Sequence, residues 1–476
     1  MEPFEKIANE MLEKALIAAG VFQQLDQKET DRIVESVFKA GFNARIPLAK
    51  MAVEETGIGI WQHKVFKNVL ATQKVYDSIK NLTTVGIISE NLMTGITEIA
   101  QPLGPIFAII PVTNPTSTII YKAMICMKSR NPIIFSVHRN AVNCGKETVR
   151  IMYEAALKAG APDDCIQIVP EHSRELTHAL MSDPRIALIL ATGGTGLVKA
   201  AYSSGNPAIG VGPGNVPVYI DKSADISFAI TSIIESKTFD NGTVCASEQA
   251  VVVEKSIASE VIKEFKKYGG FFLNSHQVEQ LGKVAIDPAT GAMSAGIVGK
   301  SVSAIAALAN IIVPDNTKLL IAPLEGIGKD FPLSGEVLTP ILGFYVCKNY
   351  QEAVKTCIDL NYLGGIGHTA SIYANDEKRI KDFAMFMNAG RIVVNTPSSQ
   401  GAVGGFYNTL NPALTLGCGT GGKNITTENI SAQHLINIQR IARRRPNYSW
   451  HNFDINRYLD EDFTVKDLYE EYYKNQ

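Results

Sequence analysis

The sequence has 476 residues, of which 46% are hydrophobic, enough chain for two or three domain-sized units around a sizeable core. This composition excludes a disordered chain, a collagen-like repeat and a small disulfide-stabilised domain. The formal net charge of −2 gives no basic field that would attract nucleic acid or a membrane surface. Only 19% of the residues are charged, and three stretches carry no charge at all: 99–121, 200–220 and 392–422. We interpret these stretches as buried core or as the wall of a pocket.

No membrane-spanning segment and no secretion signal are expected. Pro, Gly, Asn and Ser interrupt the uncharged stretches, whereas a lipid-spanning helix needs about 20 predominantly apolar residues. Acidic residues are spread through the N-terminal segment, unlike in a signal peptide. The 7 cysteines have no paired spacing, which indicates a reducing compartment, and no Cys/His cluster suggests a metal site. We expect a cytoplasmic protein without metal, nucleic-acid or membrane partners.

The first part of the chain is predicted to be helical. Apolar residues recur at helical spacing from Phe4 to Ala18 and stop at Gly20, and a second helical stretch runs from about Thr30 to Ala44. Further along, short apolar runs without alternation occupy 106–112, 132–137, 166–169, 186–191 and 217–221. Such runs are typical of strands that are buried on both faces of a parallel sheet.

Helical patterns separate these strands, and a second series of strands and helices follows Asp240. The clearest patterns are the helices at 147–159, 174–181 and 256–268 and the strand at 249–253. This alternation favours an α/β fold built from βαβ units. The tail has a basic segment at Arg443–Pro446 and then an acidic, tyrosine-rich end from Asp454, and we expect it to be a partly helical surface appendage.

Glycine is concentrated in two blocks, 192–214 and 401–422, as expected where the backbone turns sharply or approaches a ligand closely. In the first block, Gly193-Gly-Thr-Gly196 follows a predicted strand and precedes a helix, a context in which a helix N-terminus binds phosphate. The last glycine of the G-x-G-x-x-G fingerprint is replaced by Lys199, so the ordinary Rossmann motif is absent. A turn that serves geometry alone remains an alternative.

Two residues are candidates for chemistry. Cys245 lies between an Asn-Gly turn and a strand, where exposure and backbone N–H groups favour a thiolate and hold an oxyanion; the alternative is a small buried apolar residue. Three other cysteines lie in apolar runs and are expected to be buried: Cys126, Cys165 and Cys347. His368 is flanked by glycines in Gly364–Ala370. Little packing would surround it on such a loop, so it suits proton transfer, or else it caps a turn.

Five segments carry a resemblance to a known family: Pro111–Thr118, Ile189–Ala201, Tyr202–Asn215, Phe239–Gln249 and Leu416–Asn429. Together they resemble the CoA-acylating branch of the aldehyde dehydrogenase superfamily, most closely the aldehyde dehydrogenase half of bifunctional aldehyde-alcohol dehydrogenases. The similarity extends over approximately residues 25–450. It implies an α/β fold with two doubly wound parallel-sheet domains and a protruding β-hairpin arm for oligomerisation. No His-rich signature of the iron-dependent half is present, so we expect a stand-alone acylating enzyme.

The resemblance implies the reversible, NAD-dependent oxidation of an aldehyde, with CoA, to an acyl-CoA. Cys245 matches the family's catalytic thiol, which forms a thiohemiacetal and, after hydride loss, a thioester that CoA captures. The Cys245 N–H and the Asn114 side chain would bind the alkoxide, although the spacing around Asn114 departs from the Pro-Trp-Asn-x-Pro pattern of hydrolytic relatives. His368 matches the histidine of the acylating enzymes and is the expected acid or base.

One replacement favours acylation over hydrolysis. Hydrolytic aldehyde dehydrogenases carry a Glu-Leu-Gly-Gly-Lys motif whose glutamate activates water, and Val211 stands at the glutamate position of the matching Val211–Asn215 segment. Because valine cannot act as a base, the thioester is expected to persist until the CoA thiolate attacks it.

The resemblance also implies where NAD binds. The pyrophosphate would lie at Gly193, Gly194, Thr195 and Gly196. Glu336 matches the glutamate that binds the nicotinamide ribose, and His138 and Arg139 stand at the adenosine end. Arg139 is compatible with a 2′-phosphate, so NADP remains an alternative to NAD.

The expected domains are a cofactor domain at 1–239 with an oligomerisation hairpin at 84–102, a catalytic thiol domain at 240–412, a return segment at 413–445 and a C-terminal extension at 446–476. The hairpin would have an exposed strand edge that must be paired to avoid aggregation. We therefore expect a homodimer or a higher homo-oligomer.

Three functions remain open from the sequence. The favoured one converts acetaldehyde and acetyl-CoA. The second is the same chemistry on succinic semialdehyde or sulfoacetaldehyde, whose acid group would need a pocket cation; the 392–422 stretch offers only Arg391 and Lys423 at its edges. The third is a catalytically idle assembly protein, which the retained site residues argue against. Packaging into a bacterial microcompartment also stays open. We further predict that the three uncharged stretches converge around Cys245 and keep stray bases and ions away from a thioester.

Overall fold

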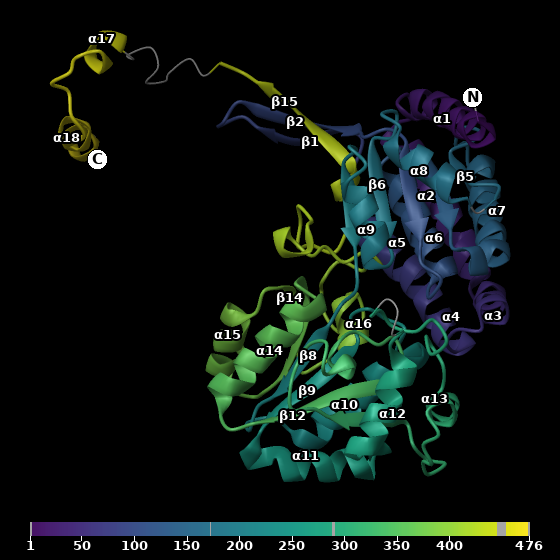
Figure 1. Cartoon of the computed structure of the whole chain (residues 1–476). Helices are drawn as coiled ribbons and strands as arrows, with labels where there is room; N and C mark the ends of the chain where they lie inside the picture. The colour runs from purple at the N-terminus through teal and green to yellow at the C-terminus, as the bar shows by residue number, and fades with distance from the viewer. Residues whose placement is uncertain (1, 172, 288–290, 445–453, 475–476) are drawn as a thin grey trace.

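The computed structural model describes residues 2–171, 173–287, 291–444 and 454–474. Three sheets organise this part of the chain (Figure 1). A five-stranded and a seven-stranded sheet, both parallel throughout, form two lobes, and a small antiparallel sheet extends from the first lobe as an arm. The predicted α/β class with two parallel sheets is confirmed.

The five-stranded sheet has the order β5-β4-β3-β6-β7. Its strands are β3 (Ile106–Ile110), β4 (Ile133–Val137), β5 (Ile166–Ile168), β6 (Leu188–Thr192) and β7 (Ala208–Val211). Every residue of β3 and β4 is buried, which explains why these runs lack apolar-polar alternation. The strand order reverses between β3 and β6, the kind of switch point at whose carboxyl edge open α/β sheets bind ligands.

Helices cover both faces of this sheet (Figure 1). Ile106, Ala108 and Ile110 of β3 pack in one cluster with α2, α6 and α7, whereas Phe107 and Ile109 pack on the opposite face with α1 and α8. The bounds are α1 (Pro3–Phe22), α2 (Gln27–Asn43), α6 (Pro115–Lys128), α7 (Val142–Lys158), α8 (Arg174–Ser182) and α9 (Thr195–Tyr202). Helix α1 continues past the expected stop at Gly20, because Phe22 is buried in the core.

The seven-stranded sheet has the order β10-β11-β12-β9-β8-β13-β14. Its strands are β8 (Val216–Ile220), β9 (Glu248–Glu254), β10 (Gly270–Phe272), β11 (Leu319–Pro323), β12 (Ile341–Cys347), β13 (Gly367–Tyr373) and β14 (Ala389–Val394). The chain changes sheet between Val211 and Val216, upstream of the boundary at residue 239 expected from the sequence, because β8 pairs with β9 and β13.

Two helices pack on one face of this sheet, α10 (Ile226–Thr238) and α11 (Lys255–Lys267). The opposite face carries α12 (Ser275–Ala285), α13 (Val302–Leu308), α14 (Tyr350–Gly364) and α15 (Glu377–Phe386). α4 (Trp61–Val69), the π-helix η1 (Leu70–Lys74) and α16 (Ser398–Ala402) lie where the two lobes meet. α3 (Arg45–Thr56) and α5 (Val75–Ile79) pack on helices of the first lobe (Figure 1). Among the described helices, none has the length and apolar character needed to cross a membrane.

The arm is a sheet of the order β1-β2-β15. The predicted hairpin forms β1 (Gly86–Asn91) and β2 (Ile96–Pro102), and the return segment adds β15 (Ile436–Ala442), which the sequence pattern did not indicate. The described part of the tail, residues 454–474, holds the helices α17 (Ile455–Tyr458) and α18 (Val465–Lys474), as expected for a partly helical extension.

Candidate active site

Cys245 lies in the loop between the 3-10 turn η3 (Phe239–Gly242) and β9. All seven cysteines are free thiols within the described residues; six are buried and Cys245 alone is partly exposed. Burial of Cys126, Cys165 and Cys347 is therefore confirmed. A partly exposed thiol at a lobe junction is what a nucleophile needs in order to meet a substrate.

Gly214 and His368 pack directly on the Cys245 loop. A Cβ atom at Gly214 would lie 2.3 Å from the carbonyl oxygen of Cys245 and 3.2 Å from the imidazole of His368. The backbone N–H of Gly214 donates to Glu336 Oε1 at 2.8 Å. The structure thus brings together the thiol loop, the segment that begins at Val211, His368 and Glu336.

His368 is the second residue of β13 and is buried, so the prediction of a loosely packed loop residue is wrong. Its neighbouring glycines mark close backbone contacts instead: a Cβ at Gly367 would lie 1.7 Å from the carbonyl oxygen of Cys418. The imidazole Nδ1 shares a 2.9 Å hydrogen bond with Thr369 Oγ1, while Nε2 has no partner among the described residues. Burial, with the charge of Arg391, lowers the pKa of His368 to about 3, so the ring is neutral near pH 7.

Arg391 is held by backbone carbonyl groups. Its guanidinium donates to His368 O and Thr427 O, both at 2.9 Å, and to Gly417 O. These contacts point the guanidinium at backbone carbonyl groups. They occupy N–H groups that a substrate carboxylate or sulfonate would need.

The surroundings of Cys245 disfavour its thiolate. Burial, reinforced by Glu336 and Cys418 and opposed by Arg391, raises the pKa of the Cys245 thiol to about 12. Burial also raises the pKa of Glu336 to about 7, against the Gly214 N–H and the Lys237 charge. The thiol is therefore protonated near pH 7 until a bound group changes the balance.

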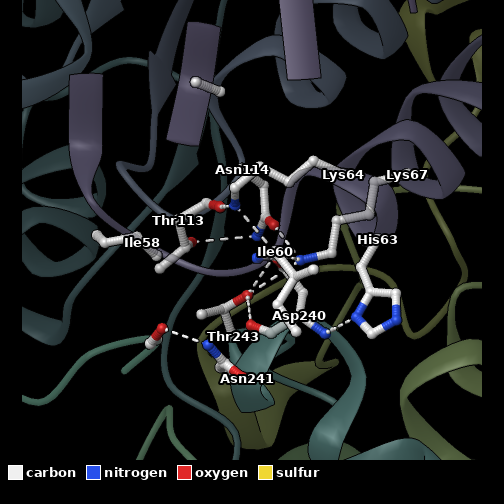
Figure 2. Close-up of polar contacts among 12 residues, drawn as sticks. Ile58, Ile60, His63, Lys64, Lys67, Thr113, Asn114, Asp240, Asn241 and Thr243 are labelled. Carbon is white, nitrogen blue, oxygen red and sulfur yellow. Dashed lines mark hydrogen bonds and ion pairs between the residues drawn. The ribbon is translucent and has the colours of Figure 1, made fainter. Parts of the chain in front are cut away.

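Asn114 follows β3 and stands at the N-cap position of α6 without a side-chain capping bond. It lies in a buried polar cluster beside the thiol loop (Figure 2). Its Oδ1 accepts a 2.6 Å hydrogen bond from Lys67 Nζ. Lys67 also donates to Asp240 at 2.5 Å and to Thr243 Oγ1 at 3.0 Å. Lys64 donates to Asp240 at 3.0 Å. We call these five residues the Asp240 cluster.

Asp240 is the centre of this cluster. Its carboxylate also accepts from Ile60 N at 2.7 Å and Thr243 Oγ1 at 2.8 Å. Burial alone would raise the pKa of Asp240, but Lys67 and Lys64 overcome it and lower the pKa to about 2. Asp240 has a left-handed backbone, with φ 50°, a conformation that non-glycine residues hold only where their surroundings require it.

No motif in the sequence indicated the Asp240 cluster. Lys64 and Lys67 lie three residues apart on α4 and look like an exposed helix face, and Asp240 belongs to an Asp-Asn-Gly turn. The usable signal was an acidic residue five positions before the candidate thiol. No sequence pattern indicated that Lys122 is buried either; it donates to Ile109 O at 3.1 Å and to Leu190 O at 2.8 Å, on the two strands that flank the switch point.

The predicted cofactor residues lie at the carboxyl edge of the five-stranded sheet. Gly193 and Gly194 connect β6 to α9, which begins with Thr195 and Gly196; Gly194, Thr195 and Gly196 are exposed. No side chain caps this helix, and a Cβ at Gly194 or Gly196 would meet no atom within 4 Å. Open backbone N–H groups at a helix start fit a pyrophosphate. His138 and Arg139 follow β4, the strand next to β3.

The three uncharged stretches meet at the thiol loop as predicted. Asn114 of the first reaches Thr243 through Lys67, and Gly214 of the second contacts Cys245. Leu416 of the third packs in one apolar cluster with Val244 and Ala246. The expectation of a site free of ions is wrong, because residues outside these stretches place buried charges around the loop. In the described ranges, no group of three or more His, Cys, Asp or Glu side chains could hold a metal ion.

Comparison with known proteins agrees with this geometry. The sequence profile of the aldehyde dehydrogenase family matches residues 5–280. The chain is 45% identical over 447 residues to the bifunctional aldehyde-alcohol dehydrogenase AdhE of Escherichia coli, covering 93% of this chain and 50% of that protein. The chain thus spans about half the length of that relative.

Two solved structures superpose on this chain over nearly their whole length. An acetylating aldehyde dehydrogenase from Geobacillus thermoglucosidasius superposes with a TM-score of 0.90 and 46% identity, covering 94% of this chain and 98% of that one. A propionaldehyde dehydrogenase from Rhodopseudomonas palustris, with bound CoA and an acylated cysteine, superposes with a TM-score of 0.82 and 27% identity, covering 92% and 97%. The chain therefore belongs to the aldehyde dehydrogenase family and, within it, to the CoA-acylating enzymes.

Proposed function

We propose that this chain catalyses the reversible, NAD-dependent oxidation of a short-chain aldehyde to its acyl-CoA, with acetaldehyde as the favoured substrate. The observation that carries the proposal is Cys245, the one partly exposed cysteine, in contact with Gly214 and beside His368 and Glu336. The acetylating enzyme from Geobacillus and the Rhodopseudomonas enzyme with its acylated cysteine support the same thiol chemistry here.

The first step is the attack of Cys245 on the aldehyde carbonyl. The Cys245 sulfur forms a bond to the carbonyl carbon, and the carbonyl oxygen becomes the alkoxide of a thiohemiacetal. The Cys245 N–H and the Asn114 amide are the donors that stabilise this charge. Because the pKa of Cys245 is raised to about 12, the thiol proton must pass to a base as the substrate site fills, and the neutral imidazole of His368 beside the loop is the candidate acceptor.

The second step transfers a hydride from the thiohemiacetal carbon and leaves a thioester on Cys245. Bound NAD would supply the hydride acceptor, with Gly193–Gly196 at its pyrophosphate, His138 and Arg139 at its adenosine end and Glu336 at its nicotinamide ribose. Glu336 lies in the same network as Gly214, so these assignments place the ribose beside the thiol loop. NAD is the first candidate, and Arg139 keeps NADP as the second.

In the third step, the acyl group is transferred from Cys245 to CoA. Val211, at the end of β7 and 2% exposed, provides no base for water, so the thioester waits for a thiol. The neutral imidazole of His368 is the candidate that accepts the CoA thiol proton, because its Nε2 has no partner in the described part of the chain. The CoA sulfur bonds to the acyl carbon and Cys245 leaves as the thiolate.

The substrate is proposed to be neutral. Succinic semialdehyde and sulfoacetaldehyde would each bring an anionic group that needs a cation. Arg391 is committed to three backbone carbonyl groups, and Lys67 is committed to the Asp240 cluster. This arrangement supports acetaldehyde over either acid-bearing aldehyde.

NADH formation with a panel of aldehydes, each with and without CoA, tests the proposal. We expect sustained turnover only with CoA, and a higher kcat/KM for acetaldehyde than for succinic semialdehyde or sulfoacetaldehyde. A preference for an acid-bearing aldehyde would overturn the substrate assignment. Absence of turnover with every aldehyde would favour the assembly-protein alternative.

We also propose that the arm pairs chains into a homodimer or higher homo-oligomer. Its two outer strands, β1 and β15, are sheet edges, and Ile438 and Ile441 on β15 are exposed. Edge strands with exposed apolar residues need a partner. Light scattering should find no monomer at micromolar concentration, and Ile438→Asp should weaken assembly. Ile312→Asp, at a more exposed isoleucine off the arm, is the control. A monomeric wild type would contradict the proposal.

A further inference from the structure

We propose that Lys67 is a positioning residue: it fixes the Asn114 carboxamide so that the amide NH2, and not its oxygen, is available to the substrate alkoxide. This inference rests on the proposed function and adds a residue that no sequence motif indicated. Figure 2 shows Lys67 between Asn114 and Asp240.

Lys67 decides the orientation of the Asn114 amide by chemistry. An ammonium group has three N–H donors and no acceptor, so the Asn114 atom at 2.6 Å from Nζ must be the oxygen. The nitrogen then lies on the other side of the amide, where one N–H donates to Thr113 Oγ1 at 3.1 Å. The second N–H is left for a ligand, since the described residues give it no acceptor.

An unheld amide would be a poor oxyanion donor. Without Lys67 the side chain could turn over and present its oxygen to the alkoxide, which would repel the developing charge. A donor that is already oriented stabilises a transition state without reorganisation at the moment of reaction. The role of Lys67 is therefore exerted through Asn114.

The other members of the cluster hold Lys67 itself. Its three donors are all engaged, by Asn114 Oδ1, the Asp240 carboxylate and Thr243 Oγ1. Thr243 lies two residues before Cys245, so the same ammonium joins the oxyanion donor to the thiol loop. Gly59 leaves the space for this arrangement, because a Cβ there would lie 2.1 Å from Asp240 Oδ1.

Lys64 provides a matched control for Lys67. Both lysines are buried on α4 and both donate to Asp240 Oδ2. Lys64 donates in addition to the backbone oxygen of Thr113, at 2.8 Å, and makes no hydrogen bond with the Asn114 side chain. Replacing either lysine removes one cation from the same carboxylate, but only the Lys67 substitution releases the amide.

The experiment is a double-mutant cycle on the hydride step, followed as the NADH burst with acetaldehyde and NAD in the absence of CoA. The variants are Lys67→Met, Lys64→Met, Asn114→Ala and the Lys67→Met/Asn114→Ala pair. We expect Lys67→Met to slow the burst by about 10- to 100-fold, which is less than the about 100- to 1000-fold lost with an oxyanion donor itself, because the Asn114 amide remains in place. Lys64→Met should be at least about tenfold faster than Lys67→Met. The pair should be no more than about threefold slower than Asn114→Ala, because Lys67 acts through Asn114.

Two results would overturn the inference. The first is an equal slowing of the burst in Lys67→Met and Lys64→Met. The second is a double variant, Lys67→Met/Asn114→Ala, whose slowing equals the product of the factors measured for the two single variants. Thermal unfolding of each variant identifies misfolding. If Lys67→Met does not fold, Lys67→Leu, which also lacks a donor, takes its place in the cycle. Lys67→Arg, which retains donors and charge, should recover part of the rate. A wild type that gives no burst would contradict the proposed function instead, whereas a normal burst with additive losses contradicts only the role of Lys67.

Discussion

The carbonyl oxygen of Cys245 lies so close to Gly214 that a Cβ atom at position 214 would approach it to 2.3 Å. The same Cβ would lie 3.2 Å from the imidazole of His368. The end of the first glycine block therefore sets the position of the thiol loop relative to its candidate base. Gly214 also donates its N–H to Glu336, so one backbone unit contacts three parts of the site.

Gly214→Ala should reduce kcat by about 100-fold, because a methyl group would displace the thiol loop and small displacements of reacting groups cost about that much. Gly214→Ala should lower the unfolding temperature by less than a large-to-small substitution that leaves a cavity in the core. Gly212→Ala is the matched control, since a Cβ there meets no atom within 4 Å. Equal activity of the two alanine variants, measured as NADH formation, would contradict the role assigned to Gly214.

Glu336→Gln should make Cys245 more reactive toward iodoacetamide. Burial is the largest cause that raises the pKa of the Cys245 thiol, and the negative charge of Glu336 raises it further. Removing that charge lowers the pKa, so a larger fraction of the thiol is ionised at pH 8–9 and reacts as the thiolate. Labelling followed by peptide mass spectrometry measures the rate.

The control for this labelling is Glu248→Gln. Glu248 is buried in the same lobe and its pKa is likewise raised by burial to about 7, but its carboxylate accepts from Ser398 N. Labelling should change less than in Glu336→Gln. Slower labelling of Glu336→Gln than of the wild type would show that the charge acts in the opposite direction. The KM for NAD should rise only in Glu336→Gln.

Much of the fold follows from the sequence because its strands are long apolar runs that tolerate burial on both faces. β4, β8 and β9 begin and end within one residue of their predicted bounds. β15 could not be predicted, since four of its seven residues are polar or small and its pairing partner β2 lies more than 300 positions earlier. Strand pairing over that distance leaves no local signal.

The part of the site in which a single residue carries the chemistry could be predicted from the sequence. The part in which several buried charged residues from distant segments form one cluster could not. Cys245 is recognisable from its loop. The Asp240 cluster joins α4 to η3 across more than 170 positions, and a lysine on a helix is usually exposed. His368 was expected on a loop because neighbouring glycines resemble a turn, whereas they admit the backbone of Cys418 and Asn215.

Asp240→Asn should destabilise the fold, because it leaves the cations of Lys64 and Lys67 without their carboxylate. Breaking one partner of a buried ion pair costs about 3–5 kcal/mol. Chemical denaturation at pH 7 measures the loss. Asp359→Asn is the control, since its pair with Lys355 lies at the surface and contributes at most about 1 kcal/mol.

The difference in unfolding free energy between the wild type and Asp240→Asn should depend on pH. The folded-state pKa of Asp240 is lowered to about 2, below the 3.8 of an ordinary aspartate. Its stabilisation is therefore complete above pH 4, amounts to about 2 kcal/mol, and is lost as the pH falls through 2. The difference in stability between wild type and Asp240→Asn should narrow between pH 4 and pH 2. A constant difference across that range would contradict the ionised state of Asp240.

The most direct test of the central claim is the stoichiometry of NADH formation without CoA, read together with the mass of the peptide that contains Cys245. We predict a burst of about one NADH per active site that then stops, with one acetyl group on Cys245, and turnover that resumes when CoA is added. Cys245→Ala should give no burst while retaining its unfolding temperature. Continuous NADH formation without CoA, with no acyl group on Cys245, would contradict a thioester that waits for CoA.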